Sequence, residues 1–511
     1  MTEPLMTEPG LIDARTHRLA RRISDVLAID PGAGAIEFDG RWTSWGQIAG
    51  FATQIKELVG EHGGDAPQVG ILLRNTPVQV ATFLGVLLSG GCVVAINPSR
   101  GDSRTREDIR NLTLPIVIGT ADDLSNLVEE QSTTVVTIAD VATAPVVTTA
   151  AASSGVPDQS PPGVAIRMLT SGTTGPPKRI DLTYDMLAHS VLGTESDDRT
   201  PQTLSSGVAI VNAPLVHIGG VFRTLQCIVA ARPYVLLPRF DLDSWADAVR
   251  LYRPRAVSLV PTAVRMVLHS ELSRDDLASI RVVTSGTAPL SAEDADAFTA
   301  KFGIPVLTSY AATEFGGGVA GWTLDDHRLY WTAKRGSVGR ANPGAQMRVV
   351  DDSGEDVGPD RVGLLEVRPA QLGPGADWVA TTDLARIDAD GFLWILGRAD
   401  QAIIRGGFKV IPEDVRAALE SHPSVEGCAI IGLPDQRLGA APVAMVELRT
   451  GSTATPDDLV EYLSDRLARY EIPTRFDIVD AIPRTPSGKA DLGEVHRYFE
   501  TGHFDNGGDD V

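Results

Sequence analysis

Apolar and polar residues along the first part of the chain follow helix and strand periods in turn. Helical spacing covers 44–58 and 77–90, and the second helix leads into a strand-like apolar run at 92–96. A further buried strand is predicted at 164–169. Strands that alternate with helices in this way are typical of α/β proteins with parallel sheets.

The same alternation continues through the middle of the chain. Helical stretches are predicted at 244–251, 262–268 and 291–302. Strand-like runs separate them, at 207–211, 234–237, 256–260, 281–284 and 306–309. Shorter strands with Gly and Asp turns follow at 347–350 and 363–367, and they predict a β-rich subdomain.

The pattern restarts after residue 400. Helices are predicted at 412–420 and 456–467, and strands at 428–431 and 443–448. We therefore expect an α/β protein with a large N-terminal domain at 1–399, built from stacked α/β subdomains plus the β-rich subdomain. A small, mobile α+β C-terminal domain is expected at 400–511. Residues 142–162 are predicted to be a connector, and the acidic, Gly-rich end at 501–511 to be disordered.

Composition limits the possible partners and compartments. The chain has 511 residues, 43% of them hydrophobic, which predicts a well-packed soluble protein of more than one domain. A formal net charge of -21 disfavours nucleic acid or an anionic membrane as the main partner, because both attract basic surfaces. The N-terminus does not resemble a signal peptide, and no apolar run reaches about 18 residues, so we expect a cytoplasmic protein without a membrane span.

The three cysteines, Cys92, Cys227 and Cys428, stand far apart beside apolar neighbours. Their spacing predicts buried thiols, and neither a disulfide framework nor a zinc site is suggested.

A loop rich in hydroxyls and glycines follows the predicted strand at 164–169. It consists of Thr170, Ser171, Gly172, Thr173, Thr174, Gly175, Pro176, Pro177 and Lys178. Glycines let a backbone approach a polyanion, hydroxyls add donors, and the lysine supplies charge, so the loop is suited to phosphate. Its spacing differs from the Walker A motif, and composition alone favours a surface linker over a phosphate site.

The order of residues in this loop resembles the signature loop of the AMP-forming acyl-CoA synthetases, members of the adenylate-forming (ANL) superfamily. Arg179 stands where that family has glycine, and it would either contact phosphate or point to solvent. Later motifs of the family follow in the family's order, at 214–220, 285–290, 310–314, 381–383, 390–392, 397–400 and 483–489. The last matches without departure, whereas Thr287, Ala311 and Thr382 replace glycines in the others.

The resemblance implies a ligase that activates a carboxylic acid as acyl-AMP, releases pyrophosphate, and transfers the acyl group to coenzyme A. It implies ATP, Mg²⁺ and coenzyme A as cofactors and co-substrates. Catalytic roles fall on Lys489, Glu314, Thr170 and His217, and Glu314 and Thr170 would also hold the metal. For His217, a gate beside the acyl pocket and ordinary packing are equally open.

Nucleotide binding is implied for residues of the loop and of the later motifs. They are Thr170, Ser171, Gly172, Thr173, Thr174, Gly175, Lys178, Ser285, Gly286, Thr287, Ala288, Tyr310, Ala311, Ala312, Thr313, Asp383, Arg398 and Lys489. Tyr310 would pack against adenine, and Asp383 would accept hydrogen bonds from the ribose hydroxyls.

Asp400 occupies the hinge position about which the family's small domain rotates. That rotation would bring Arg405, Gly406, Gly407 and Phe408 to coenzyme A, with Lys409 and Arg437 as further phosphate contacts suggested by charge. The acyl pocket is expected to include Val216, His217, Val221, Ala311, Gly316 and Gly317. These small residues suit a bulky apolar or alicyclic acid, and fatty or aromatic acids are also compatible.

Other functions share parts of this pattern. An acyl-AMP ligase that loads a carrier protein has the same first step and differs in its thiol acceptor. A non-catalytic relative is disfavoured by the presence of Lys489, Glu314 and Asp383, and amino-acid activation by the sequence at 240–243. The motifs alone do not exclude oxygenase chemistry of the luciferase kind. The expected partners are a small carboxylate, ATP and coenzyme A, and a homodimer is possible.

Overall fold

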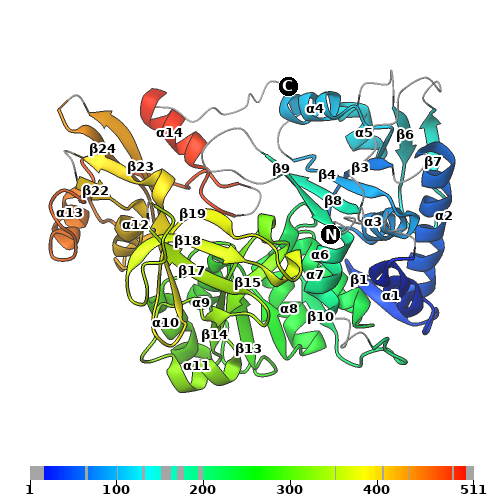
Figure 1. Cartoon of the computed structure of the whole chain (residues 1–511), viewed down its shortest axis with the longest axis horizontal. Helices are drawn as coiled ribbons and strands as arrows, with labels where there is room; N and C mark the ends of the chain where they lie inside the picture. Colours follow the sequence, from blue (N-terminus) through cyan, green and yellow to red (C-terminus); the bar gives the residue numbers. More distant parts are fainter. Residues whose placement is uncertain are drawn as a thin grey trace, which may run out of the picture.

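The computed structural model describes residues 16–63, 67–99, 102–128, 133–150, 163–169, 178–193, 199–351, 353–405, 408–435, 437–485 and 488–501. These residues form a large domain and a smaller C-terminal lobe, which lies at the left of Figure 1 in orange and red. The predicted phosphate loop at 170–177, Gly406 and Gly407, and the predicted disordered end at 502–511 lie outside the described residues.

The N-terminal part of the large domain is built on a seven-stranded sheet in the order β7-β6-β5-β3-β4-β8-β9. Neighbours from β6 to β8 run parallel, and β7 and β9 pair antiparallel at the edges. β3 and β4 are buried along their whole length, as expected for parallel strands covered on both faces. The strands are β3 (Gln68–Leu72), β4 (Cys92–Ile96), β5 (Ile116–Gly119), β6 (Thr134–Thr137), β7 (Val146–Thr149), β8 (Val164–Leu169) and β9 (Arg179–Thr183). The helices are α1 (Arg18–Leu27), α2 (Trp45–Gly63), α3 (Pro77–Ser89), α4 (Asp102–Leu112), α5 (Ala121–Leu127) and α6 (Tyr184–Leu192).

The middle of the large domain contains a four-stranded sheet, β10-β11-β1-β2, and a five-stranded sheet, β12-β13-β14-β15-β16. β13 and β14 run parallel, so their C-terminal ends, which carry two predicted site motifs, reach the same edge of the sheet. The strands are β1 (Gly34–Phe38), β2 (Arg41–Ser44), β10 (Ala209–Val211), β11 (Tyr234–Leu236), β12 (Ala256–Ser258), β13 (Val282–Ser285), β14 (Val306–Ala312), β15 (Gly317–Gly321) and β16 (Arg340–Ala341). The helices are α7 (Ile218–Val229), α8 (Leu242–Tyr252), α9 (Pro261–His269), α10 (Ala292–Phe302), α11 (Leu324–Tyr330) and the short η2 (Thr313–Phe315).

An antiparallel sheet, β17-β18-β19-β20, stands between the green part of the large domain and the small lobe in Figure 1. Its strands are β17 (Gln346–Val350), β18 (Val362–Arg368), β19 (Val379–Ile387) and β20 (Leu393–Arg398), with η3 (Ala370–Leu372) between β18 and β19. This sheet is the β-rich subdomain that the sequence predicts.

The small lobe contains the sheet β22-β21-β24-β23, and β25 pairs with β24. Its own core includes Val415, Leu419, Val446 and Leu459, all fully buried. The elements are η4 (Ala399–Gln401), β21 (Ile403–Arg405), β22 (Phe408–Val410), α12 (Pro412–Glu420), β23 (Val425–Asp435), β24 (Gly439–Leu448), α13 (Pro456–Ser464), β25 (Phe476–Val479) and α14 (Leu492–Thr501).

The predicted α/β class and the predicted helices and strands are confirmed, with differences in extent. The connector expected at 142–162 contains β7, because its Val and Thr residues pair with β6. β23 and β24 are longer than predicted, because they pair with each other residue by residue well beyond their apolar centres. The helix expected at 456–467 ends at Ser464.

Two further findings concern the whole described chain. The three cysteines are buried, as predicted. No helix among the described residues is long and apolar enough to cross a membrane.

Candidate active site

Two predicted nucleotide ligands from different sheets meet at one hydrogen bond. Tyr310 lies in β14 and Asp383 in β19, and the Tyr310 hydroxyl donates to Oδ2 of Asp383. The backbone N–H of Asp383 donates to Oγ1 of Thr381 at 3.0 Å. Burial raises the pKa of Tyr310, and the Asp383 charge raises it further, so the phenol stays protonated. The pair is therefore fixed, and Oδ1 of Asp383 has no hydrogen bond from the described residues.

Arg398 and Asp400, predicted as a ribose contact and a hinge, hold each other. Nε and Nη2 of Arg398 donate to the Asp400 carboxylate at 2.9 and 2.6 Å. Arg398 also stands opposite Asp383 in the β19–β20 pair. The hydrogen bonds to Asp400 raise the pKa of Arg398, and the Asp383 charge adds to the rise. The predicted hinge is thus joined by a charge pair to the predicted nucleotide side of the site.

Glu314 directly follows β14 in η2, near the edge that carries Tyr310. Its carboxylate is exposed and makes no hydrogen bond or ion pair with the described residues. Such a carboxylate fits Mg²⁺, which proteins bind through one or two carboxylates while phosphates supply further oxygens. Within the described chain no cluster of three acidic, His or Cys side chains could hold a metal by itself. Thr170, the other predicted metal residue, lies outside the described residues.

Lys489 reaches the site from the small lobe on a short hairpin. The N–H of Thr485 donates to the carbonyl of Lys489 at 2.7 Å, and Arg484 bridges to Ala490. A Cβ added at Gly488 would lie 3.4 Å from Oγ1 of Thr262 in α9, so the hairpin lies against the large domain. Residues 486 and 487, between Thr485 and Gly488, lie outside the described residues.

The side chain of Lys489 is half-buried and lies near several residues of the predicted site. Burial lowers the pKa of Lys489 and Arg398 lowers it further, whereas Asp383 and Glu314 raise it. No hydrogen bond or ion pair joins this ammonium to the described residues. A half-buried cation among nucleotide-binding candidates is therefore available to an anionic ligand.

His217 precedes the first turn of α7 as its N-cap residue, without a side-chain capping bond. Burial lowers the pKa of His217 to about 4, and the nearby Lys489 contributes. Its Nε2 is buried and has no hydrogen-bond partner among the described residues. At neutral pH the ring is therefore uncharged, with one polar atom left for a ligand.

The segment 285–288 lies at the end of β13, the neighbour of β14. The Ser285 hydroxyl is buried and has no partner in the described part of the chain. A Cβ at Gly286 would meet Oγ of Ser309 at 2.8 Å, so this glycine permits a close approach to β14. Thr287 has a φ of 72°, a conformation that β-branched residues rarely adopt. The glycine of the related family is thus replaced by a threonine under backbone strain.

The predicted acyl-pocket residues fall into two groups. Val216 and His217 are half-buried and Ala311 is exposed, all near the edge that carries Glu314. Val221, Gly316 and Gly317 are buried. An added Cβ at Gly316 would meet Met186 of α6 at 2.8 Å, and one at Gly317 would meet Ser190 at 3.0 Å. These two glycines therefore allow α6 to pack closely, and their role in an acyl pocket stays a prediction.

Two predicted coenzyme A residues, Arg405 and Phe408, contact Tyr470 of the small lobe. Nη1 of Arg405 donates to the carbonyl of Tyr470 at 2.7 Å, and the exposed Phe408 ring stacks on Tyr470 with centroids 4.6 Å apart. Figure 1 shows β22 on the side of the lobe away from the large domain. Arg437, the weaker candidate, donates its backbone N–H to Asp435 at 2.9 Å.

Two cations at the predicted phosphate loop also have defined positions. Lys178 is exposed at the end of the loop. Arg179 donates to Asp108 at 2.6 Å and to the carbonyl of Ala95 at 3.2 Å. The expectation that Arg179 points to solvent is therefore wrong, because Asp108 and the Ala95 carbonyl hold it, and a contact with phosphate stays a prediction.

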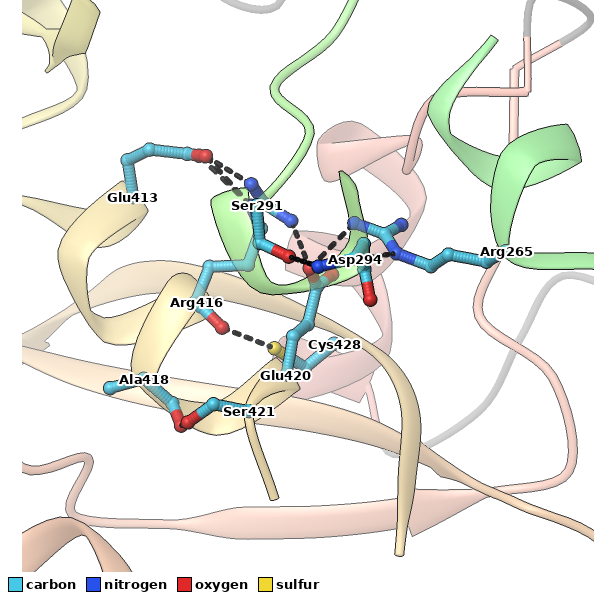
Figure 2. Close-up of polar contacts among 9 residues, drawn as sticks. All are labelled: Arg265, Ser291, Asp294, Glu413, Arg416, Ala418, Glu420, Ser421 and Cys428. Carbon is cyan, nitrogen blue, oxygen red and sulfur yellow. Dashed lines mark hydrogen bonds and ion pairs between the residues drawn. The ribbon is translucent and has the colours of Figure 1, made fainter. Parts of the chain in front are cut away.

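An ion-pair cluster that joins the two domains was not predicted. Figure 2 shows Arg265 of α9 between Asp294 of α10 and Glu420 of α12, at 2.8 and 2.9 Å. Arg416 bonds both Glu420 and Glu413 on the same helix. We call these five residues the interface cluster. Only the spacing of Glu413, Arg416 and Glu420 was visible in the sequence, since Arg265 and Glu420 are 155 positions apart.

Comparison with known proteins identifies matching family models and relatives. The model described as AMP-binding enzyme matches residues 24–375, and the model of the AMP-binding enzyme C-terminal domain matches residues 414–489. Among curated proteins, 4-coumarate–CoA ligase-like 5 of Oryza sativa subsp. japonica is 28% identical over 505 residues, 94% of this chain and 85% of the relative. Indoleacetate–CoA ligase of Aromatoleum aromaticum is 27% identical over 94% of this chain and 98% of its own.

The fold is also similar to solved structures. The crystal structure of ATP-bound MatB from Rhodopseudomonas palustris superimposes with a TM-score of 0.81, at 24% identity. That similarity covers 96% of this chain and 99% of the other. The large and small domains therefore match a known arrangement over nearly their whole length.

Proposed function

The chain belongs to the AMP-binding enzyme family, and from that premise we propose how its site works. The protein is an AMP-forming acid–thiol ligase that uses ATP and coenzyme A. It activates a carboxylic acid as an acyl-adenylate and then forms the thioester. The roles of individual residues and the identity of the acid are our proposal.

The position of Lys489 is the main observation that supports our account of the first half-reaction. The attack of a carboxylate on the α-phosphate brings two anions together, so a fixed cation between them lowers the barrier. Lys489 comes from the small lobe, yet Asp383 and Glu314 of the large domain act on its charge. It has no carboxylate partner of its own among the described residues. We assign Lys489 to the carboxylate and the α-phosphate.

The fixed residues around it would position the nucleotide. Asp383, held by Tyr310, offers its second carboxylate oxygen to the ribose hydroxyls. The Ser285 hydroxyl and Nε2 of His217 offer buried polar atoms that the described protein leaves unpaired. Glu314 would hold Mg²⁺, which neutralises phosphate charge when it is bound.

The second half-reaction requires that Lys489 withdraws so that a thiol can reach the acyl carbon. We propose that the small domain rotates about Asp400 and brings the β21–β22 hairpin with Arg405 and Phe408 to the site. The Arg398–Asp400 pair at 2.6 Å would change in this motion, because it joins β20 to the segment that leads into the small lobe. Movement of domains between two steps is a common way to separate two chemistries.

For the acid, we propose a bulky carboxylate with an apolar body. Small residues near the site support this, and two relatives are named for aromatic acids, 4-coumarate and indoleacetate. The acceptor is proposed to be coenzyme A, and the alternative is the thiol of a carrier protein.

Release of pyrophosphate from MgATP across a panel of aliphatic, alicyclic and aromatic acids, with and without coenzyme A, tests the proposal. We expect multiple turnovers only with one class of acid and coenzyme A, with the matching acyl-CoA found by mass spectrometry. A single turnover unchanged by coenzyme A would instead favour a carrier-protein acceptor. No acid-dependent release with any acid would contradict the proposed function.

A further inference from the structure

Helix α7 follows His217, its N-cap residue, and presents a half-buried face that the proposed function does not yet use. Gly219, Phe222, Arg223 and Gln226 are half-buried, whereas Val221 on the other side of the helix is fully buried in the core. Positions 219, 222, 223 and 226 share one helical face because they are three or four residues apart. This face, which we call the 219–226 face, runs along the helix away from His217.

Open space lies beside the 219–226 face next to His217. A Cβ added at Gly219 would have no atom within 4 Å, whereas one at the next glycine, Gly220, would meet the carbonyl oxygen of Pro214 at 2.1 Å. One side of the helix start is therefore packed and the other is open. A group bound at His217 could extend along the open side.

Arg223, one turn beyond Gly219, has no acidic partner. Its Nη2 donates to Oγ1 of Thr284 at 2.9 Å, and its Nη1 donates to Oε1 of Gln226 at 3.2 Å. Both acceptors are neutral, and no carboxylate of the described residues forms an ion pair with it. Burial lowers the pKa of Arg223, which reports that the guanidinium has lost part of its water.

Such an arrangement is unfavourable for the protein alone. A desolvated charge is normally paired, because neutral hydrogen bonds compensate it only in part. The two arginines of the interface cluster, Arg265 and Arg416, each meet two carboxylates. Arg223 is half-buried and bonds only neutral acceptors, so it keeps donor capacity in a fork that matches a carboxylate or carbonyl oxygen.

Arg223 is connected to the predicted reaction site in two ways, through Thr284 in β13 and through His217 at the start of its own helix. Thr284, its acceptor, is followed in β13 by Ser285, whose segment is predicted to border the adenine. His217 and Arg223 are six residues apart, which is about 9 Å along a helix axis. An acid with its reacting carboxylate near Lys489 and His217 would therefore reach Arg223 with its far end.

We propose that Arg223 determines specificity by binding an oxygen acceptor, a carboxylate or a carbonyl, at the far end of the acid. The inference rests on the proposed ligase function and makes the substrate more specific. The acid then has an apolar body, which lies along Gly219 and Phe222, and a polar group at each end. Thr284 and Gln226 hold the guanidinium in place before the acid binds.

Matched acids and variants of Arg223 test this assignment. The panel contains octanoic, 7-oxooctanoic and suberic acids, and the ring pair 3-cyclohexylpropionic and 3-(4-oxocyclohexyl)propionic acids. Pyrophosphate release gives kcat/KM for the wild type, Arg223→Met and Arg223→Lys. Isothermal titration of each acid without ATP gives binding independently of the chemistry.

We expect the wild type to prefer acids with the distal oxygen, and Arg223→Met to lose about 10- to 100-fold in kcat/KM for these alone, the range for a hydrogen bond to a charged group. Arg223→Lys should recover part of the loss for suberic acid, because it keeps the charge. Equal losses for all five acids, or a wild-type preference for octanoic or 3-cyclohexylpropionic acid, would overturn the assignment while the ligase function stands. Arg223-dependent binding without any pyrophosphate release would support the assignment and contradict the ligase function.

Discussion

The domain interface and the reaction site both contain cations that are at least half-buried, but these cations differ in whether a carboxylate pairs with them. In the interface cluster, Arg265 lies between Asp294 and Glu420 at 2.8 and 2.9 Å. In the site, Lys489 and Arg223 have no carboxylate partner among the described residues. The protein therefore neutralises the arginines that join its domains, and it leaves two cations of the predicted site, Lys489 and Arg223, without a carboxylate from the described residues.

The difference separates two uses of a buried charge. A buried pair contributes little net stability compared with an apolar contact, although loss of one partner is costly. It does define one relative position of two parts, since the pair forms only there. An unpaired cation costs stability, and its energy is recovered only when an anion binds. This reasoning predicts that variants of the two regions will affect different measurements.

The largest expected effect is that of Lys489→Ala on acyl-adenylate formation. Removal of one fixed electrostatic contact to a transition state typically lowers the rate by about 10²-fold or more. The melting temperature should stay the same or rise, because the ammonium has no partner among the described residues to lose. Pyrophosphate release and thermal unfolding measure the two effects.

A matched control for this variant is Lys56→Ala, which removes an exposed lysine of α2. It should change neither measurement. Adenylation by Lys489→Ala within a few-fold of the wild type would contradict the role of Lys489, and a large fall in melting temperature would contradict the view that its charge is unpaired.

In the interface cluster, Arg265→Met should lower the stability of the protein, in contrast to Lys489→Ala. The substitution leaves Asp294 without its cation and removes the contact between α9 and α12, so we expect a loss of about 1–3 kcal/mol in unfolding free energy. Adenylation should fall about tenfold, because the small domain holds Lys489 at the site less firmly. The transfer of a preformed acyl-adenylate to coenzyme A should change little.

A double-mutant cycle with Glu420→Gln sharpens the test of the interface. The coupling energy between Arg265 and Glu420 should be clearly positive, since the two residues are in direct contact. Additive effects of the two substitutions would contradict the idea that this pair holds the domains in the adenylating position. An equal loss in both half-reactions would point to general destabilisation.

His217 gives a pH-dependent test of the site's unpaired groups. Its pKa is lowered from 6.5 to about 4 in the folded protein, first by burial and then by Lys489. Between these values the unfolded chain binds the proton that the folded chain does not, so stability falls as the pH decreases from 6.5 to about 4. The slope from this group is at most about 1.4 kcal/mol per pH unit. His217→Gln should remove that part of the slope in denaturant unfolding curves measured across this window, and an unchanged slope would contradict the lowered pKa.

Much of this comparison was accessible from the sequence, and some of it was not. The residues that meet at Lys489 stand in recognisable motifs, although Tyr310 and Asp383 are 73 positions apart. Parallel strands that end at one sheet edge explain why the segments after β13 and β14 lie together, whereas Asp383 comes from a separate antiparallel sheet. Arg223 and Arg265 belong to no motif, because an arginine on an amphipathic helix is ordinary until its neighbours are known. Whether such a charge is paired depends on distant residues, such as Glu420, that only the fold brings together.

The smallest expected effect is that of relieving backbone strain. One strained threonine lies in the predicted site and another lies outside it. Thr287 in the predicted adenine segment and Thr113 after α4 both have positive φ, 72° and 45°, and both side chains are exposed. Glycine at either position relieves about 1–2 kcal/mol of strain, and the greater freedom of the unfolded chain offsets roughly 0.5–1 kcal/mol of it. Both Thr287→Gly and Thr113→Gly should therefore raise stability slightly.

Only one of these two threonines lies where the nucleotide is proposed to bind, so the pair separates strain from function. Thr287→Gly should raise the KM for ATP about two- to threefold, because the segment that ends β13 becomes less restricted before binding. Thr113→Gly should leave the KM unchanged. Equal KM values for both variants and the wild type would mean that the strain at Thr287 does not contribute to ATP binding. Thr287 would then resemble Thr113, whose strain has no role in the site.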